Sequence, residues 1–322
     1  MIKLVLKRGT KQVARKNKTK EKQIVSLIIA FIVIILFLLG IEYEDIEEFF
    51  NPSKSVINKV TAEESENIVL EGDDILQIHF FDVGQADSIL LISNNQTMLI
   101  DAGNNDDGDL VVSNLKKLGI SKLNYVVGTH PHEDHIGGLD NVIDNFEIEN
   151  IFMPKVQTNT KTFEDILDAI LSKNLSITTP NAGDKFMVGN VECEVMLAGT
   201  GTKEEQENLN LSSIVIRVKY EEQSYLFMGD SEIENENSRL WPQTNVLKVG
   251  HHGSNTSSSK SFLNQVLPQI SIISVGKDND YGHPHNEVMD RLKRIETLIY
   301  RTDKKGNILL ESDGENNKIS FY

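Results

Sequence analysis

The chain has 322 residues, of which 39% are hydrophobic and 25% charged, and a formal net charge of −16. This is an ordinary globular composition, and the length allows one large domain plus an appendage. The single cysteine, Cys193, excludes an intramolecular disulfide, so nothing in the fold requires an oxidising compartment.

The first 73 residues divide into three segments of contrasting charge. Residues 1–23 form a basic tail, with nine Lys or Arg and one acid before position 23. Residues 24–41 carry no charge over eighteen positions, enough for a helix of about 27 Å, which is close to the thickness of a bilayer core. Residues 42–73 are acidic and polar without a sustained pattern, as expected of a tether.

The order of these segments predicts a single-pass protein of the cell membrane. Basic residues before an apolar span and acidic residues after it favour a cytoplasmic N-terminus, which would place residues 74–322 outside the cytoplasm. A cleaved signal peptide is the alternative, but no small-residue cleavage site follows cleanly and the apolar run is long for a signal. The basic tail would contact anionic lipid beside the span or, alternatively, nucleic acid.

From about residue 75 the pattern changes to short strands and helices. We expect strands at 76–82, 86–93 and 97–101, with a hairpin turn at Asn94-Asn95. Helices and strands then alternate at 109–118, 122–129, 139–145, 148–153 and 162–173, and further strands are expected at 191–197, 213–220, 224–228, 245–250 and 270–275. Two successive halves of this kind fit stacked mixed sheets with helices outside.

The most informative stretch follows one of these strands, where His130, His132, Asp134 and His135 fall within six positions. Imidazole and carboxylate are ligands of zinc and other first-row divalent ions. In an extended loop His130 and His132 project to the same side and can share one ion, while Asp134 and His135, at a helix start, can serve a second. Surface clustering or helix capping is the alternative, but this spacing in a strand-to-helix turn favours two metals roughly 3.5–4 Å apart.

Carboxylates and histidines also follow three other predicted strands. Asp101 could hold the histidine loop through hydrogen bonds. Asp230 could cap the next helix, but beside a metal cluster we favour a bridging ligand. Of the pair His251 and His252, we expect His251 to complete the second ion because it stands nearer the strand end, with His252 as a weak ligand or a supporting residue.

The histidine motif resembles the signature of the metallo-β-lactamase superfamily, which implies an αββα sandwich with a dinuclear metal site at the sheet ends. A narrower resemblance, to the C-terminal hydrolase domain of ComEC-type competence DNA channels and its free-standing relatives, covers residues 75–322. Seven stretches carry it in family order: 81–89, 99–103, 129–139, 210–215, 227–230, 247–254 and 281–285. Ala86 departs mildly from the usual glycine, and one predicted span cannot form the pore of those many-helix channels.

The resemblance also exposes a difference. Familiar zinc hydrolases of the superfamily place a ligating histidine between the two halves of the site, whereas this chain has no histidine between His135 and His251 and offers Asn210 instead. An amide oxygen is a weaker and harder ligand than imidazole. We therefore expect a loosened ion, and manganese becomes a candidate beside zinc.

A metal-dependent hydrolase of phosphodiesters, including nucleases, is the function that the resemblance implies, with a water activated by two ions attacking phosphorus. Asp134 would orient or deprotonate this water. His283 would stabilise the transition state or protonate the leaving oxygen, with a structural role as the alternative. Ser254 and Ser257 would offer hydroxyl groups to phosphate near a helix start.

The charge leaves the substrate open. The basic tail and the acidic segment cancel, so residues 74–322 carry the whole net charge of −16. DNA binding normally draws its affinity from Lys and Arg, so DNA is not indicated by charge and small phosphodiesters compete with it. An envelope esterase, such as a phosphorylcholine-type esterase, is a second candidate, and a non-catalytic metal-stabilised binding module is a third.

Overall fold

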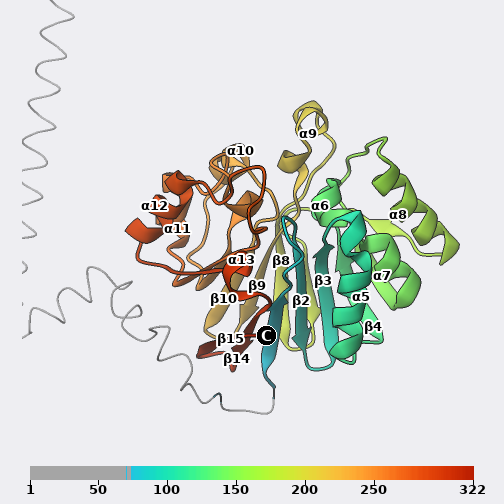
Figure 1. Cartoon of the computed structure of the whole chain (residues 1–322), viewed down its shortest axis with the longest axis horizontal. Coiled ribbons are helices and arrows are strands. Elements are labelled where there is room, and N and C mark those ends of the chain that lie inside the picture. The colour runs from blue at the N-terminus through green and yellow to red at the C-terminus, as the bar shows by residue number, and fades with distance from the viewer. Residues whose placement is uncertain (1–69, 71–73) are drawn as a thin grey trace, which may run out of the picture. The chain divides into compact units, whose positions relative to one another are not determined.

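The computed structural model describes Leu70 and residues 74–322, which form two β-sheets packed face to face between two layers of helices (Figure 1). The predicted αββα sandwich is confirmed. The predicted tail and membrane helix, and all but one residue of the predicted tether, lie outside the described residues. Among the helices that are described, none combines the length and apolar character needed to cross a bilayer.

The first sheet has eight strands in the order β15-β14-β1-β2-β3-β4-β5-β6. They are β1 Leu76–Phe80, β2 Ser88–Ser93, β3 Gln96–Ala102, β4 Lys122–Val127, β5 Glu147–Phe152, β6 Ile177–Thr178, β14 Ile308–Ser312 and β15 Asn317–Phe321. The strands from β15 to β3 pair antiparallel, whereas β3, β4 and β5 run parallel. The turn between β2 and β3 lies at Asn94-Asn95 as predicted, with the positive φ of 44° and 60° that a tight hairpin turn requires.

The second sheet has seven strands in the order β13-β12-β11-β10-β9-β8-β7. They are β7 Lys185–Val188, β8 Val191–Leu197, β9 Val215–Tyr220, β10 Gln223–Phe227, β11 Val246–Lys248, β12 Ile270–Ile273 and β13 Leu298–Arg301. It repeats the plan of the first sheet, since β7 to β10 are antiparallel and β10 to β13 parallel. Each sheet therefore has one edge where neighbouring parallel strands deliver their carboxyl ends together.

Helices cover the outer face of each sheet (Figure 1). The first sheet is covered by α5 Gly108–Lys117, α6 Glu133–Ile136, α7 Leu139–Asn145 and α8 Lys161–Ser172, and the second by α11 Lys260–Val266 and α12 Asn286–Arg294. The shorter helices are α9 Lys203–Glu207, α10 Ile233–Asn237 and α13 Thr302–Lys305, with 3-10 turns η1 Asn105–Asp107, η2 Leu209–Ser212 and η3 Gly250–Gly253.

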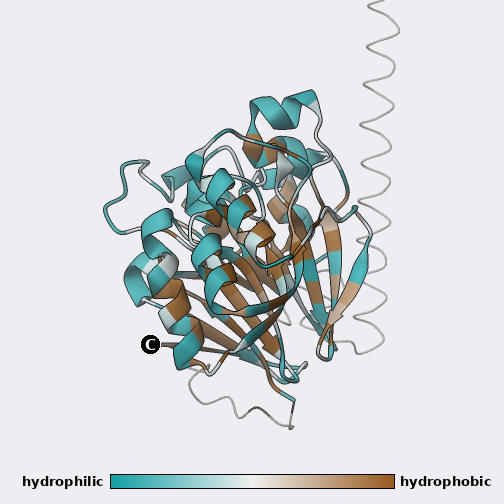
Figure 2. Cartoon of the chain, turned by 90° about the vertical axis from the view of Figure 1, so that its right-hand side faces the viewer, coloured by the Kyte–Doolittle hydropathy of each residue, from teal (hydrophilic) through white to brown (hydrophobic). Residues whose placement is uncertain are grey.

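Three apolar layers hold this arrangement together. The central one lies between the sheets and includes Phe80 and Phe227, while the outer two pack helix side chains such as Phe163 and Phe262 against the sheets. Strand β10 is buried at all five positions because both of its faces are covered. Figure 2 shows the same pattern, with hydrophobic residues on the strands and the inward helix faces. Apolar burial is the main favourable term in folding, and here it fixes the strand ends that carry the functional loops.

Candidate metal centre

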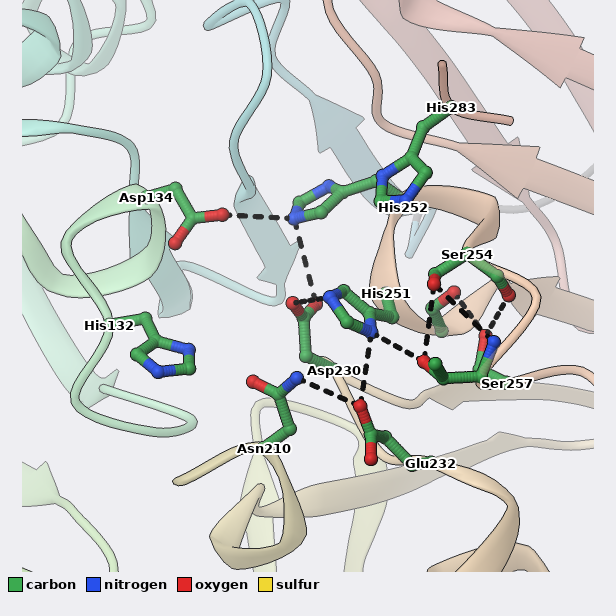
Figure 3. A network of polar contacts seen from close by, with 12 residues as sticks. His132, Asp134, Asn210, Asp230, Glu232, His251, His252, Ser254, Ser257 and His283 are labelled. Carbon is green, nitrogen blue, oxygen red and sulfur yellow. Dashed lines mark hydrogen bonds and ion pairs between the residues drawn. The ribbon is translucent and has the colours of Figure 1, made fainter. Parts of the chain in front are cut away.

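The functional side chains leave the carboxyl ends of β3, β4, β10 and β11. Asp101 lies near the end of β3, His130 follows β4, Asp230 follows β10 and His252 follows β11. Ends of parallel strands meet at one edge of a sheet, where α/β proteins usually bind ligands. Because the two sheets are stacked, these four loops converge, and most of the side chains predicted for the site meet there (Figure 3).

Asp134, His135 and His252, which we call the second group, gather around Asp230. Together these four residues offer ligand atoms that all lie within 4.8 Å of one another. Oδ1 of Asp230 is 3.1 Å from Nε2 of His135, and Oδ2 of Asp134 is 3.3 Å from Nε2 of His252.

Three atoms of this cluster, Nε2 of His135, Nε2 of His252 and Oδ1 of Asp230, are buried and face one another, but none has a partner in hydrogen-bond geometry in the described part of the chain. Such a buried atom typically costs about 1–3 kcal/mol. These three atoms come from different loops and converge, which fits the coordination of a divalent cation. Imidazole nitrogen and carboxylate oxygen are ligands of such ions, so these residues can hold one.

His130, His132 and Asn210, which we call the first group, lie beside it. Nε2 of His130 is 3.0 Å from Nδ1 of His132, so both lone pairs can face one ion as the extended loop predicts. The amide oxygen of Asn210 is buried and, within the described residues, has no hydrogen-bond partner. Figure 3 shows this oxygen on the side of His132. The donor set of two imidazoles and one amide oxygen also fits a divalent cation, with fewer charges than the second group.

Contacts behind the ligands fix which nitrogen of each histidine faces the site. Nδ1 of His135 is 2.7 Å from Oδ2 of Asp101, and that carboxylate also accepts hydrogen bonds from the backbone and hydroxyl of Thr129. Nδ1 of His252 is 3.0 Å from the carbonyl oxygen of Ser274. Because these acceptors take the Nδ1 proton, Nε2 of both rings is free to bind a metal. Asp101 thus supports His135, as expected for a residue behind the ligands.

The pair His251 and His252 is arranged opposite to our expectation. His252 is buried and contacts Asp134 and Asp230, whereas His251 is partly exposed, with Nε2 3.5 Å from Oδ2 of Asp230 and Nδ1 2.9 Å from Oγ1 of Thr256. Both histidines have left-handed backbone conformations, with φ of 50° and 51°. Two successive left-handed residues turn the chain sharply, so distance from the strand end was a wrong guide to which ring faces the cluster.

Carboxylates dominate the electrostatics of the second group. Burial alone would lower the pKa of His135, but Asp230, Asp101 and Asp134 raise it well above its usual value. The pKa of His130 is instead lowered, first by burial and then by the neighbouring His135. A negative potential that stabilises a proton on His135 equally stabilises a divalent cation in its place.

The two serines expected to bind phosphate do not face the site. Ser257 is fully buried, and its hydroxyl donates to the carbonyl oxygen of Gly250 at 2.7 Å. Ser254 is also buried, and its hydroxyl lies 3.2 Å from that of Thr256. Both hydroxyls therefore serve to shape the loop before α11, a role that the run of small polar residues could not distinguish from ligand binding.

His283 lies at the mouth of the site and depends on Gln85, which the sequence did not single out. The backbone N–H of Gly276 donates to Oε1 of Gln85 at 3.1 Å, which turns Nε2 of Gln85 toward Nδ1 of His283 at 3.3 Å. Since an amide nitrogen only donates, Nδ1 accepts and Nε2 carries the ring proton. Burial, followed by His252 and His251, lowers the pKa of His283 to about 4, which favours its neutral form.

A cleft of about 290 Å³ opens over both groups. The two groups and the central carboxylate contribute His132, Asp134, Asn210, His252 and Asp230 to its lining. The rest of the lining is Gln85, Glu133, His251, Tyr281 and His283. Among the described residues that line it, none is Lys or Arg. Neutralising an anionic substrate in this cleft would therefore fall to bound cations.

Comparisons with known proteins agree with this geometry. A family model described as the metallo-beta-lactamase superfamily matches residues 81–277. ComE operon protein 3 of Bacillus subtilis is 29% identical over 272 residues, which is 76% of this chain and 34% of that protein. Recombination protein 2 of Haemophilus influenzae is 28% identical over 239 residues, which is 72% of this chain and 28% of that protein. The chain thus spans about a third of the length of these relatives.

Among solved structures, the metallo-beta-lactamase fold protein YhfI from Bacillus subtilis superimposes with a TM-score of 0.52 at 11% identity, covering 74% of this chain and 100% of that one. At this identity the likeness concerns the fold alone. With a family model spanning more than half of its residues, and with the histidine motif and Asp230 assembled at the ends of two stacked sheets, the chain belongs to the metallo-β-lactamase superfamily.

Proposed function

We propose that this chain is a dinuclear metallohydrolase that cleaves phosphodiester bonds. The observation that carries the proposal is the gathering of Asp134, His135 and His252 around Asp230, with His130, His132 and Asn210 beside them. These residues lie beneath a cleft whose described lining has no Lys or Arg. Two divalent ions, zinc or manganese, would lower the pKa of a water molecule and polarise a phosphoryl oxygen when bound.

Asp134 is the residue best placed to handle the proton of the attacking water. Its side chain is 32% exposed toward the cleft while its Oδ2 stays 3.3 Å from Nε2 of His252. Burial would raise the pKa of Asp134, but His135 and His252 hold it below the usual value. The carboxylate is therefore ionised at neutral pH and can accept a hydrogen bond from water as it attacks.

His283 and Tyr281 form the opposite wall. The two rings stack with centroids 5.6 Å apart and an interplanar angle of 23°, and Tyr281 is 69% exposed at the mouth. The Nε2 proton of His283 would stabilise a developing negative charge on the leaving oxygen. Tyr281 would stack on an aromatic part of the leaving group, such as the base of a nucleoside or a nitrophenyl ring.

The name of one relative, Recombination protein 2, supports a nucleic-acid substrate. The net charge of −16 on residues 74–322 weighs against tight binding of long DNA. We therefore favour short or single-stranded phosphodiesters. The apolar segment 24–41 and its flanking charges support a membrane anchor with a cytoplasmic N-terminus and an extracytoplasmic hydrolase domain.

An envelope esterase, such as one acting on phosphorylcholine-type groups, is the second candidate. The size of the cleft favours it, because about 290 Å³ lies at the low end of ligand pockets and suits a small head group. A purely binding, metal-stabilised module is the third possibility, and it predicts ion binding without turnover.

A substrate panel tests these functions. The full chain in detergent, loaded with Mn²⁺ or Zn²⁺, would be assayed on bis(p-nitrophenyl) phosphate, single-stranded DNA, p-nitrophenylphosphorylcholine and p-nitrophenyl acetate, with the Asp230→Asn variant as the control. We expect metal-dependent cleavage of the first two substrates. Turnover of the choline-containing diester alone, or of p-nitrophenyl acetate alone, would favour the envelope esterase, and ion binding with no turnover would refute an enzyme.

A further inference from the structure

Glu232 lies beside the site, and nothing in the sequence pattern singled it out. It precedes α10, and its two carboxylate oxygens accept separate hydrogen bonds. Nδ2 of Asn208 donates to Oε2 at 2.8 Å, and Nδ2 of Asn210 donates to Oε1 at 3.1 Å. Nδ1 of His251 lies 3.5 Å from the same Oε1 (Figure 3).

This contact decides which end of the Asn210 amide faces the metal centre. A carboxylate can only accept hydrogen bonds, so the end of the amide that meets Glu232 must be its nitrogen. The oxygen then points the other way, where it is buried and lacks a hydrogen-bond partner within the described residues. A flipped amide would place its oxygen against the carboxylate of Glu232 and its N–H groups toward the ion, both of which are unfavourable.

The hydrogen bonds around Glu232 hold both of its side-chain oxygens in place. Oε2 accepts from Asn208 at 2.8 Å and Oε1 accepts from Asn210 at 3.1 Å. The bond from Asn210 is therefore well suited to fix a side-chain amide that could otherwise rotate by half a turn.

We propose that Glu232 is a positioning residue that holds Asn210 with its amide oxygen toward the ion of His130 and His132, in place of a third imidazole. The inference rests on the metal-binding part of the proposed function and not on the reaction. It predicts that the two ions bind with different affinities. The first group supplies neutral ligands, whereas the second group adds the carboxylate of Asp134, so the ion of the first group is the weaker one.

The test is a Mn²⁺ titration of the full chain in detergent, followed by calorimetry and by electron paramagnetic resonance of the coupled ion pair. The wild-type chain should bind one ion tightly and a second more weakly. Glu232→Gln should raise the Kd of the weaker ion by about 10–100-fold, the range seen when residues behind metal ligands are changed, and leave the tight ion unchanged. Glu234→Gln, on the exposed face of α10, is the matched control and should change neither.

A second background separates positioning from a general structural role. In Asn210→Asp either end of the side chain is an oxygen, so orientation no longer matters and Glu232 becomes a repelling neighbour. Glu232→Gln should therefore lower the Kd of the weaker ion in that background, which reverses the direction of its effect. Four results would each overturn the inference. They are an equal rise in both Kd values, no rise in either, the same direction of change in both backgrounds, or a wild-type chain that binds a single ion. Two ions with the expected pattern but no phosphodiester turnover would refute the proposed function and leave this inference standing.

Discussion

The two groups of ligands differ in charge and in support, although they share one fold and one central carboxylate. The first group offers two imidazoles and an amide, with His130 and His132 supplied by one short loop. The second group draws Asp134 and His135 from one sheet and His252 from the other, and acceptors lock the Nδ1 atoms of both histidines. In the proposed centre the two ions would therefore be held unequally, and the weaker one would depend on residues behind its ligands.

The largest effect is expected from Asp230, which lies between the groups. Asp230→Asn preserves the shape but removes the charge that faces His135 and His252. We expect loss of turnover and a fall in metal affinity of more than about 100-fold, beyond the range for supporting residues, as measured by metal analysis after gel filtration. A variant that keeps two ions would show that the groups do not share this carboxylate.

Substituting each histidine of the adjacent pair tests which of the two binds metal. His252→Ala should reduce the bound metal to one ion and lower turnover by about 100-fold or more, because it removes a ligand of the tight ion. His251→Ala should keep both ions, since its ring is partly exposed and its Nδ1 lies 2.9 Å from Oγ1 of Thr256. Metal content by mass spectrometry under native conditions distinguishes them. The reverse result would restore His251 as the ligand that the strand-end argument favoured.

Stepwise removal of the metal should show, through changes in Tm, that the two ions bind with different affinities. Each ion bound at a concentration 100 times its Kd stabilises the folded chain by about 2.7 kcal/mol, which corresponds to a shift in Tm of about 5–10 °C for a domain of this size. Titrating a chelator during thermal unfolding should therefore give two separate decreases in Tm, the first with little chelator. A single decrease would mean that the two ions leave together.

The smallest effect is expected at the rim, on the side of the second group. The ring of His283 stacks on that of His252 with an interplanar angle of 21°, and the ring of Tyr281 stacks on that of His283. Tyr281→Ala should raise the KM for bis(p-nitrophenyl) phosphate by about fivefold to tenfold, near the lower end of stacking energies, and Tyr281→Phe should not. The KM for glycerophosphocholine, a diester without a ring, is the internal control. An equal rise for both diesters would show that Tyr281 only shapes the cleft.

Much of the histidine motif and of the fold could be predicted from local sequence. His130, His132, Asp134 and His135 lie in six consecutive positions at a strand end, where geometry alone places them together. The predicted strands, the Asn94-Asn95 turn and the alternation in two halves correspond to the observed sheets. These features depend on residue types and on spacing over short distances. They can therefore be predicted without knowing which distant segments of the chain lie beside them.

The tertiary structure decided what depends on contacts between distant parts of the chain. Left-handed backbone angles decide that His252, and not His251, faces the cluster. Ser257 is buried and donates its hydroxyl to Gly250. Gln85 and Glu232 acquire their roles from partners that packing brings together. A carboxylate or amide carries the same chemistry wherever it lies in a sequence. Only the assembled fold determines which atom it faces, and that orientation separates a metal ligand from a structural hydrogen bond.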